Sequence, residues 1–436
     1  MVTHALAARA APSTKAHRLS LPGAIRLGNH IAVDAAEAIR QVCDRHGEVV
    51  RVRMPRHTLY LTSSDVAIQH VLKTRQANYE KATLRGAFAS LFGDGLIISD
   101  GPRWLADRRL MQPFFGKTSM TKLKEDIGAS IAEEVRAFGA GSVNVQAAAD
   151  RASLVTFART IFGVEIGPHV DALRRLFAAG VHAVYERDGA LIDWDRWFTT
   201  KRQERFLADR AELYAIVDAL VRDHRPNGTM FDALIDAARA MPNGAQWLRD
   251  HVITMLIAGH ETVAATLVWC MMLLAADPRA QAELRLGIDQ GDDSYLRQVL
   301  FETMRLYPAV WCVSGRRALE ADEIAGVPIA AGEMVVPCIY AMHRNARLWS
   351  QPDAFLPERF AHAQASKRTS YLPFGAGARV CIGEHMAMIM LEAALKELIA
   401  RYEIAPIDRS MLREVGHDAA LTLRPKTEPF LTLTTR

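Results

Sequence analysis

The alternation of apolar and polar positions predicts a chain built mainly from helices, with short strands near its N-terminus. Residues 35–46 have helical spacing, and two strand-like stretches, 49–54 and 58–62, follow on either side of Pro55. Between residues 117 and 240, runs rich in Ala, Leu and Arg repeat at helical spacing and are interrupted by Gly- and Pro-containing breaks. The pattern therefore predicts a small N-terminal sheet and a largely helical middle.

The most apolar region, residues 252–276, is long enough to cross a membrane. A polar Gly-His-Glu-Thr stretch at residues 259–262 interrupts it, so we interpret the region as part of a buried core helix over residues 247–276. Further strands are predicted toward the C-terminus at residues 333–339, and as a closing hairpin at residues 419–424 and 429–434.

Composition favours a soluble enzyme with a large core. Half of the 436 residues are apolar, 23% are charged and the net charge is only +4, a balance that does not suggest a nucleic-acid-binding protein. The cysteines show neither a pairing pattern nor Cys-x-x-Cys spacing, which argues against a disulfide scaffold or a zinc site and favours a reducing cytoplasm. They are Cys43, Cys270, Cys312, Cys338 and Cys381.

The N-terminal segment is Ala-rich, basic and free of acidic residues over positions 1–18. It lacks the apolar stretch of a secretory signal, and a transit peptide is the alternative. We expect residues 1–18 to be a flexible segment and residues 19–436 to form a single domain.

One thiol stands out near the end of the chain, in the stretch F-G-A-G-A-R-V-C-I-G at residues 374–383. Cys381 lies where a Gly-rich loop is predicted to become a helix, and the positive end of a helix dipole favours a thiolate. The glycines allow close approach of backbone to a large flat partner, and Arg379 adds a positive charge. A nucleophilic cysteine or an ordinary buried one are the alternatives.

Three other patterns have the spacing of functional groups on helices. Ala258 and Thr262 share a face of the long helix with Glu261 at its edge, which suits proton delivery by a hydroxyl and a carboxylate. The alternative is a Thr bonded to its own helix and a Glu in solvent. Trp104 with Arg108, and Glu302 with Arg305, are also helical neighbours, and exposed pairs are the alternative for both.

Taken together, these motifs resemble those of the cytochrome P450 family. The loop at residues 374–383 matches the family's heme-binding loop, residues 258–262 its A-G-x-[DE]-T motif, and Glu302 to Arg305 its E-x-x-R motif. The resemblance implies a mainly α-helical fold with small β-sheets and heme b held between the long helix and the Cys381 loop. It implies a soluble, bacterial-type heme-thiolate monooxygenase that inserts one atom of O2 into an apolar small molecule.

The resemblance also assigns roles to residues. Cys381 would be the iron ligand, Glu261 and Thr262 the proton relay, and Glu302, Arg305 and Arg359 a buried structural triad. Contacts with the cofactor are expected for Trp104, Arg108, Ala258, Gly259, Arg317, Phe374, Gly377, Arg379 and Gly383. Contacts with substrate are expected for Phe88, Phe92, Ile97, Trp194, Val310 and Trp311.

A final substrate hypothesis concerns Arg56 and Tyr60. Their spacing is similar to that of an Arg and a Tyr at the channel mouth of a fatty-acid hydroxylase in the family, where they could hold a carboxylate. A solvated basic edge is the alternative, and a neutral terpenoid or polycyclic substrate is the favoured competitor.

Electrons must come from outside, because the motifs leave no room for a flavin or ferredoxin module. The resemblance implies a separate ferredoxin or flavodoxin with its reductase. Candidate docking residues are Arg103, Arg109, Lys117, Lys122 and Lys124. The rival functions are a peroxide-using or isomerising heme-thiolate enzyme and a heme-based binding or sensor protein. No nucleic-acid partner or membrane anchor is expected.

Overall fold

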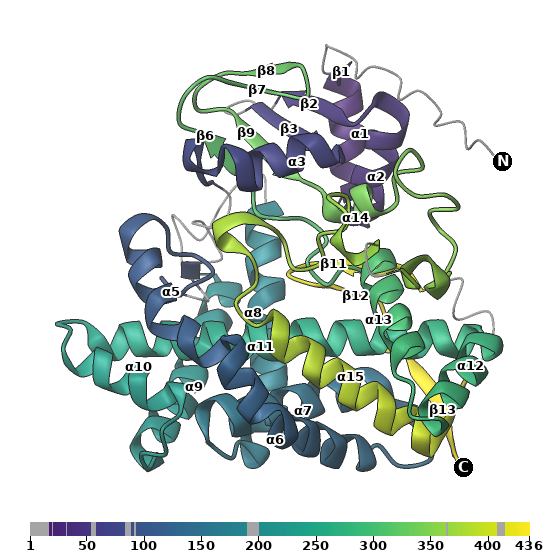
Figure 1. Cartoon of the computed structure of the whole chain (residues 1–436). Coiled ribbons are helices and arrows are strands. Elements are labelled where there is room, and N and C mark those ends of the chain that lie inside the picture. The colour runs from purple at the N-terminus through teal and green to yellow at the C-terminus, as the bar shows by residue number, and fades with distance from the viewer. Residues whose placement is uncertain are drawn as a thin grey trace.

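The computed structural model describes residues 17–19, 21–31, 33–53, 58–82, 89–90, 93–189, 200–362, 365–407 and 415–436. Arg56, Phe88, Phe92 and Trp194 lie outside the described residues. A helical body and a smaller sheet-rich part make up the molecule, with the N-terminal strands and β6–β9 together in the upper part of Figure 1. This confirms the predicted mainly α-helical fold with small sheets.

The helices of the body follow one another along the chain from α5 to α13, and α15 joins them after the strands β6–β9. They are α5 (Gly101–Phe115), α6 (Lys117–Arg136), α7 (Val145–Phe157), α8 (Val170–Gly189), α9 (Lys201–Asp223), α10 (Met230–Arg239), α11 (Gly244–Ala276), α12 (Pro278–Asp289), α13 (Ser294–Leu306) and α15 (Glu384–Arg401). Shorter helices accompany the sheets: α1 (Leu21–Ile31), α2 (Ala35–His46), α3 (Asp65–Gln69) and α14 (Ile339–His343). A π-helical turn, η1 (His70–Thr74), continues α3.

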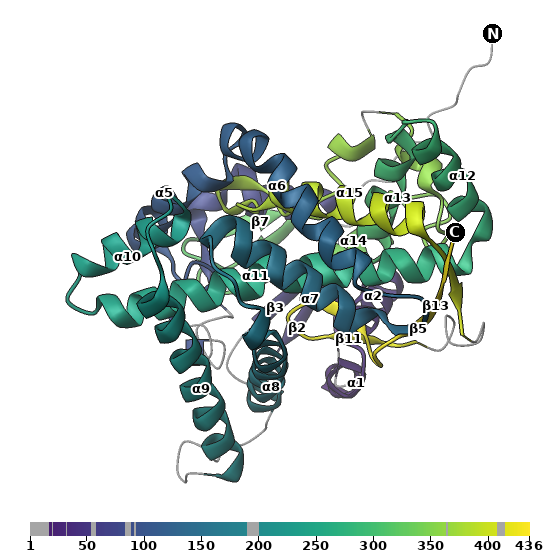
Figure 2. The same ribbon diagram turned by 90° about the horizontal axis from the view of Figure 1, so that it is seen from below.

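Helix α11 is the axis of the body. It packs against α7, α10, α13 and α15, and runs through the middle of the helices in Figures 1 and 2. By length and composition it could span a membrane, but 78% of its apolar window is buried inside the protein. A helix that is apolar on every side is stable where other helices surround it, which agrees with the predicted core helix.

The largest sheet has six strands in the order β1-β2-β3-β9-β6-β4. Its strands are β1 (His17–Arg18), β2 (Val49–Arg53), β3 (Thr58–Thr62), β4 (Tyr79–Lys81), β6 (Arg316–Ala318) and β9 (Met334–Pro337). The N-terminal sheet is thus completed by strands from much later in the chain. Two-stranded sheets pair β7 (Asp322–Ile324) with β8 (Val327–Ile329) and β11 (His417–Ala419) with β12 (Leu423–Pro425).

The predicted C-terminal hairpin is wrong. Strand β13 (Phe430–Thr435) does not pair with β12 but lies between β10 (Tyr402–Pro406) and β5 (Gly141–Asn144). Leu431 and Leu433 are almost completely buried, so this alternating strand is stabilised by long-range partners that cover its apolar side. Local spacing alone does not reveal such partners.

Candidate active site

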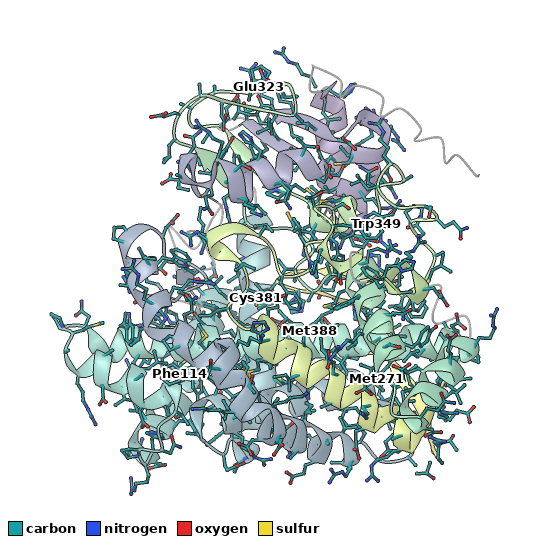
Figure 3. The ribbon with its side chains drawn as sticks, in the orientation of Figure 1. Phe114, Met271, Glu323, Trp349, Cys381 and Met388 are labelled. Atoms are coloured by element: carbon teal, nitrogen blue, oxygen red, sulfur yellow. The ribbon has the colours of Figure 1, made fainter. Side chains whose placement is uncertain are left out.

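A cavity of about 320 Å³ lies between α11 and the loop that precedes α15. Its α11 wall consists of Ala258, Gly259, Thr262, Val263 and Thr266. The opposite wall is the segment from Leu372 to Gly383, including Phe374, Gly375, Arg379 and Cys381. Figure 3 shows Cys381 just before the first turn of α15, with Met388 further along that helix. The two sequence motifs far apart in the chain therefore face each other.

The Cys381 loop is closed by its own backbone. The Cys381 N–H donates to the Phe374 carbonyl at 2.9 Å, and Gly375 and Gly377 adopt φ values of 75° and 74°. A Cβ on Gly377 would lie 1.8 Å from the Leu72 carbonyl oxygen of η1, whereas one on Gly375 would meet nothing within 4 Å. Gly377 is thus required for packing against η1, and not only for approach of a flat partner.

The side chain of Cys381 lines the cavity and is exposed to it. Protein atoms around the sulfur reduce its hydration and raise the pKa of the thiol, while the Gly383 N–H and the positive charge of Arg108 act in the opposite direction. The thiolate predicted at this helix start is thus opposed by reduced hydration and favoured by the Gly383 N–H and Arg108, and a bound metal ion would favour it further.

Three predicted cofactor contacts, Trp104, Arg108 and Arg379, form a cationic group around an indole ring beside the cavity. The guanidinium carbon of Arg379 lies 4.1 Å from the centroid of a Trp104 ring, and that of Arg108 lies 5.7 Å from it. Arg379 also donates to Asp100. Burial lowers the pKa of Arg108, and among the described residues no carboxylate lies within ion-pair distance of it. Arg108 is thus a half-buried cation with no anionic partner in the described part of the chain.

The third cation of the site is Arg316, which the sequence interpretation missed in favour of its neighbour. Arg316 lines the cavity and is 6% exposed, and burial lowers its pKa to about 10. Arg317 lies outside the cavity, 4.0 Å from Glu80. Successive side chains of a strand point to opposite faces, so β6 can direct only one of the two inward. The proposed role of Arg317 passes to Arg316.

On α11, the hydroxyl of Thr262 lines the cavity and donates to the Ala258 carbonyl at 3.0 Å. Thr266 repeats this bond one turn later, to Thr262 at 2.9 Å. A Cβ on Gly259 would lie 2.2 Å from the ring of Phe157 in α7. The ring of Phe157 therefore fills the space that a side chain at position 259 would need, and Phe157 itself lines the cavity.

Glu261 does not line the cavity. Its Oε1 lies 3.3 Å from Arg424, which also donates to Asp150, and its Oε2 is buried without a hydrogen-bond partner among the described residues. Burial raises the pKa of Glu261, and Arg424 opposes this effect. The expected carboxylate next to Thr262 is present, but it faces a buried charge cluster on the other side of α11.

The predicted structural residues form one buried network. Arg305 donates to both carboxylate oxygens of Glu302 at 2.7 and 2.8 Å, and Arg359 donates to Glu302 at 3.2 Å. Arg305 also donates to the His343 carbonyl, and the His343 ring accepts from the Leu372 N–H at 2.9 Å. The network is thereby joined to the first residue of the cavity wall that contains Cys381.

Of the predicted substrate contacts, Ile97 and Val310 line the cavity. Trp311 is turned away and donates to the Ala420 carbonyl at 3.0 Å. Tyr60 is 2% exposed in β3 and donates to Glu333 at 2.8 Å. The Tyr60 hydroxyl is therefore already hydrogen-bonded within the protein. The geometry does not support a role for Tyr60 in the proposed carboxylate clamp.

Several residues at the site gave no sequence signal. Phe115, Phe157 and Ile339 line the cavity, but isolated apolar residues look like any other core positions. The buried Asp107 of α5 accepts a hydrogen bond from the Trp247 indole at 3.1 Å and lies 3.3 Å from His251. Because Trp247 and His251 belong to α11, these contacts fix α5 against α11 and thereby position Arg108, the residue after Asp107.

The fold and site define a class of helical proteins with a cysteine and several buried or half-buried arginines around an apolar cavity. Comparison with known sequences agrees: the Cytochrome P450 family profile matches residues 21–431. Cyclooctatin synthase of Streptomyces melanosporofaciens is 27% identical over 431 residues, covering 92% of this chain and 93% of the relative. Cyclooctat-9-en-7-ol 5-monooxygenase of the same organism is 26% identical, covering 84% of each chain.

A third relative, putative cytochrome P450 135B1 of Mycobacterium tuberculosis, is 30% identical over 370 residues, covering 80% of this chain and 76% of the relative. The chain belongs to the cytochrome P450 family. It is accordingly a cytochrome P450 monooxygenase, an oxidoreductase with a heme iron cofactor. The residues fit that group, because Cys381 offers a soft ligand and Arg108 and Arg316 are cations available for carboxylates.

Proposed function

We propose that this enzyme hydroxylates or epoxidises an apolar, terpenoid-like small molecule, with heme b as its cofactor and Cys381 as the iron ligand. The observation that supports the substrate class is the cavity wall, where Ile97, Phe157, Val310 and Val313 offer apolar surface above the cationic side. The name of one relative, a monooxygenase of cyclooctat-9-en-7-ol, points the same way.

In this proposal the chain's own residues would hold the cofactor. Arg108, Arg316 and Arg379 would bind its carboxylates, Trp104 orients Arg379 by stacking, and Cys381 would be the ligand of the metal. The bound heme supplies the activation of O2. Ala258 and Gly259 keep the α11 wall close and dry, so bulk water is excluded from the reacting position.

Thr262 is proposed to position a proton at the cavity, with Glu261 as the more distant acid. The Thr262 hydroxyl points at the cavity and gives its own proton to Ala258, so it can accept and hold a water or a substrate hydroxyl by its lone pairs. Glu261, whose pKa is raised by burial, retains a proton more readily than an exposed carboxylate. For Glu261 to deliver this proton, its ion pair with Arg424 would have to open.

Electrons are proposed to come from a separate ferredoxin or flavodoxin with its reductase. The proposed docking residues Arg103, Arg109, Lys117, Lys122 and Lys124 are all exposed, on α5 and α6. Phe115 at the end of α5 lies next to Gly383 in the Cys381 loop, so this basic surface is close to the thiol. A positive surface of this kind attracts an acidic donor. We propose a cytoplasmic location, in keeping with five free cysteines.

Spectroscopy of cysteine variants tests the proposed ligand. The reduced, CO-treated enzyme should show the strongly red-shifted Soret band of thiolate ligation, and Cys381→Ser should abolish it. Cys270→Ala, which changes a cysteine buried in α11, should keep the band. Persistence of the band in Cys381→Ser would overturn the assignment of the ligand.

A titration tests the substrate class. Neutral polycyclic alkenols should displace iron-bound water and shift the Soret band at lower concentrations than long-chain fatty acids of equal carbon number do. Turnover of a compound found in this way should require a reductant and O2. Turnover with peroxide alone, or product formation without any oxidant, would favour the peroxide-using or isomerising alternative.

A further inference from the structure

Three of the cysteines gather behind one wall of the cavity. Cys43 of α2, Cys338 after β9 and Cys312 belong to one apolar cluster with Val52 and Leu61. All three are free thiols. Cys338 is 1% exposed, whereas Cys312 is partly exposed. None of them has a part in the proposed chemistry at Cys381.

The backbone places Cys312 beside Cys338. The Val313 N–H donates to the Pro337 carbonyl at 3.0 Å, and the Tyr340 N–H donates to the Trp311 carbonyl at 2.9 Å. These two bonds hold residues 311–313 alongside residues 337–340, although they do not follow one regular strand register. Cys312 and Cys338 lie within these two stretches and belong to the same apolar cluster.

Both cysteines lie behind the cavity wall. Val313 and Ile339 line the cavity, whereas Cys312 and Cys338 do not line it and pack in the apolar cluster behind it. The Cys312 thiol donates to the Val313 carbonyl at 3.6 Å and the Cys338 thiol donates to the Val336 carbonyl at 3.3 Å. The neighbouring Cys312 thiol and burial raise the pKa of Cys338 well above its usual range. Cys312 is the more accessible of the two sulfurs.

We propose that Cys312 and Cys338 are a dithiol that hydrogen peroxide oxidises to a disulfide. The Cys312 sulfur attacks one peroxide oxygen, the O–O bond breaks, and a sulfenic acid and one water form. The Cys338 sulfur then displaces the sulfenic oxygen, the S–S bond forms, and a second water leaves with the remaining proton. Two thiols lose two electrons in total, and the peroxide gains them.

The cross-link would join two parts of the cavity wall. Val310 and Val313 flank Cys312, and Ile339 follows Cys338, so the disulfide fixes these residues relative to each other. Oxidation would thereby restrict the part of the cavity wall that contains Val310, Val313 and Ile339 and would leave the Cys381 loop unmodified. This inference concerns the polypeptide alone and does not depend on the proposed substrate.

Peptide mapping of the intact holoenzyme tests the proposal. Cleavage after Arg and Lys places the three thiols in separate peptides, residues 41–45, 306–316 and 318–344. After treatment with hydrogen peroxide and alkylation of remaining thiols, we expect peptides 306–316 and 318–344 to be joined, with the loss of two alkylatable thiols per chain. A reductant should separate them.

Two variants give matched controls. Cys43→Ala should leave the 306–316 to 318–344 cross-link unchanged, and Cys338→Ser should replace it with a Cys312 sulfenic acid that dimedone traps. Slower amide exchange of residues 309–313 after oxidation would show that the cavity wall is restrained. Recovery of both peptides unlinked, or a cross-link that contains Cys43, would overturn the proposal, whatever the spectrum of the heme.

Discussion

Two glycines of the Cys381 loop show how one residue type can serve two purposes. Gly375 and Gly377 have nearly the same left-handed φ, but only Gly377 faces backbone, the Leu72 carbonyl. Gly375→Ala should cost about 1–2 kcal/mol, the strain of a left-handed Ala. Gly377→Ala should cost about 1–3 kcal/mol more, because a carbonyl of η1 must move.

Urea unfolding of both variants, each in the apo form, gives the two free energies. Because the change is the same Gly→Ala at almost the same φ, the difference isolates the contact with Leu72. Equal losses of stability in the two variants would contradict the packing role of Gly377.

The hydroxyl of Thr262 should matter for proton delivery more than for the helix. Thr262→Ala is expected to retain substrate binding but to lower the rate of product formation by about 10²–10⁴, typical for a lost proton-transfer group, with electrons diverted to peroxide. Thr266→Ala removes the same kind of hydroxyl-to-carbonyl bond one turn away and should have a much smaller effect. Product formed per electron consumed is the quantity to measure, and equal values in the two variants would remove Thr262 from the mechanism.

For single residues, the sequence predicted the chemical role of a side chain better than the direction in which that side chain points. Cys381, Thr262 and the buried Glu302 pair could be found because their residue types and spacing are unusual. The orientations of Arg316 and Glu261 could not be predicted. Which of two successive strand residues points inward, and which partner a helix residue meets, depend on distant segments of the chain. Arg424, which pairs with Glu261, lies 163 positions later in the chain by the numbering of the two residues.

At the scale of elements, the buried network on α13 should dominate the stability of the cavity wall. Glu302→Gln leaves the fully buried Arg305 without its counter-charge and should destabilise the protein by about 3–5 kcal/mol. Arg297→Gln on the same helix breaks only an exposed pair with Glu392 and should cost less than about 1 kcal/mol. Chemical denaturation compares them, and similar costs would mean that Arg305 finds water or another anion.

Helices were easier to predict than sheets for a physical reason. The bounds predicted for residues 35–46 agree with α2, and the long apolar pattern located α11 to within three residues at its start. Helical hydrogen bonds are local, so the pattern contains most of the information. The predicted pairing of β13 was wrong because its partners, β5 and β10, lie elsewhere in the chain.

At the scale of the whole molecule, two buried histidines should make stability depend on pH. Burial lowers the pKa of His260 to about 4 and that of His343 to about 3, against 6.5 for the ordinary side chain. Their contribution is complete above pH 6.5 and is lost as the pH falls toward these values, because the unfolded chain takes up protons first. Between pH 8 and pH 5 each histidine should account for about 2 kcal/mol.

Denaturation at the two pH values checks this expectation. His260→Gln should reduce the stability lost between pH 8 and pH 5 by about 2 kcal/mol. His182→Gln, at a histidine whose side chain is 63% exposed, controls for the removal of an imidazole. A pH dependence in His260→Gln that equals that of the parent would show that His260 is protonated alike in both states.

The largest sheet cannot be completed until late in the synthesis of the chain. Strand β3 pairs with β9, and Tyr60 reaches Glu333, 273 residues later. At about 5–20 residues per second a ribosome needs roughly 15–55 s to cover that distance. During that interval the edge of β3 that will receive β9 has no partner, and the nascent N-terminal region is then exposed to aggregation and to chaperones.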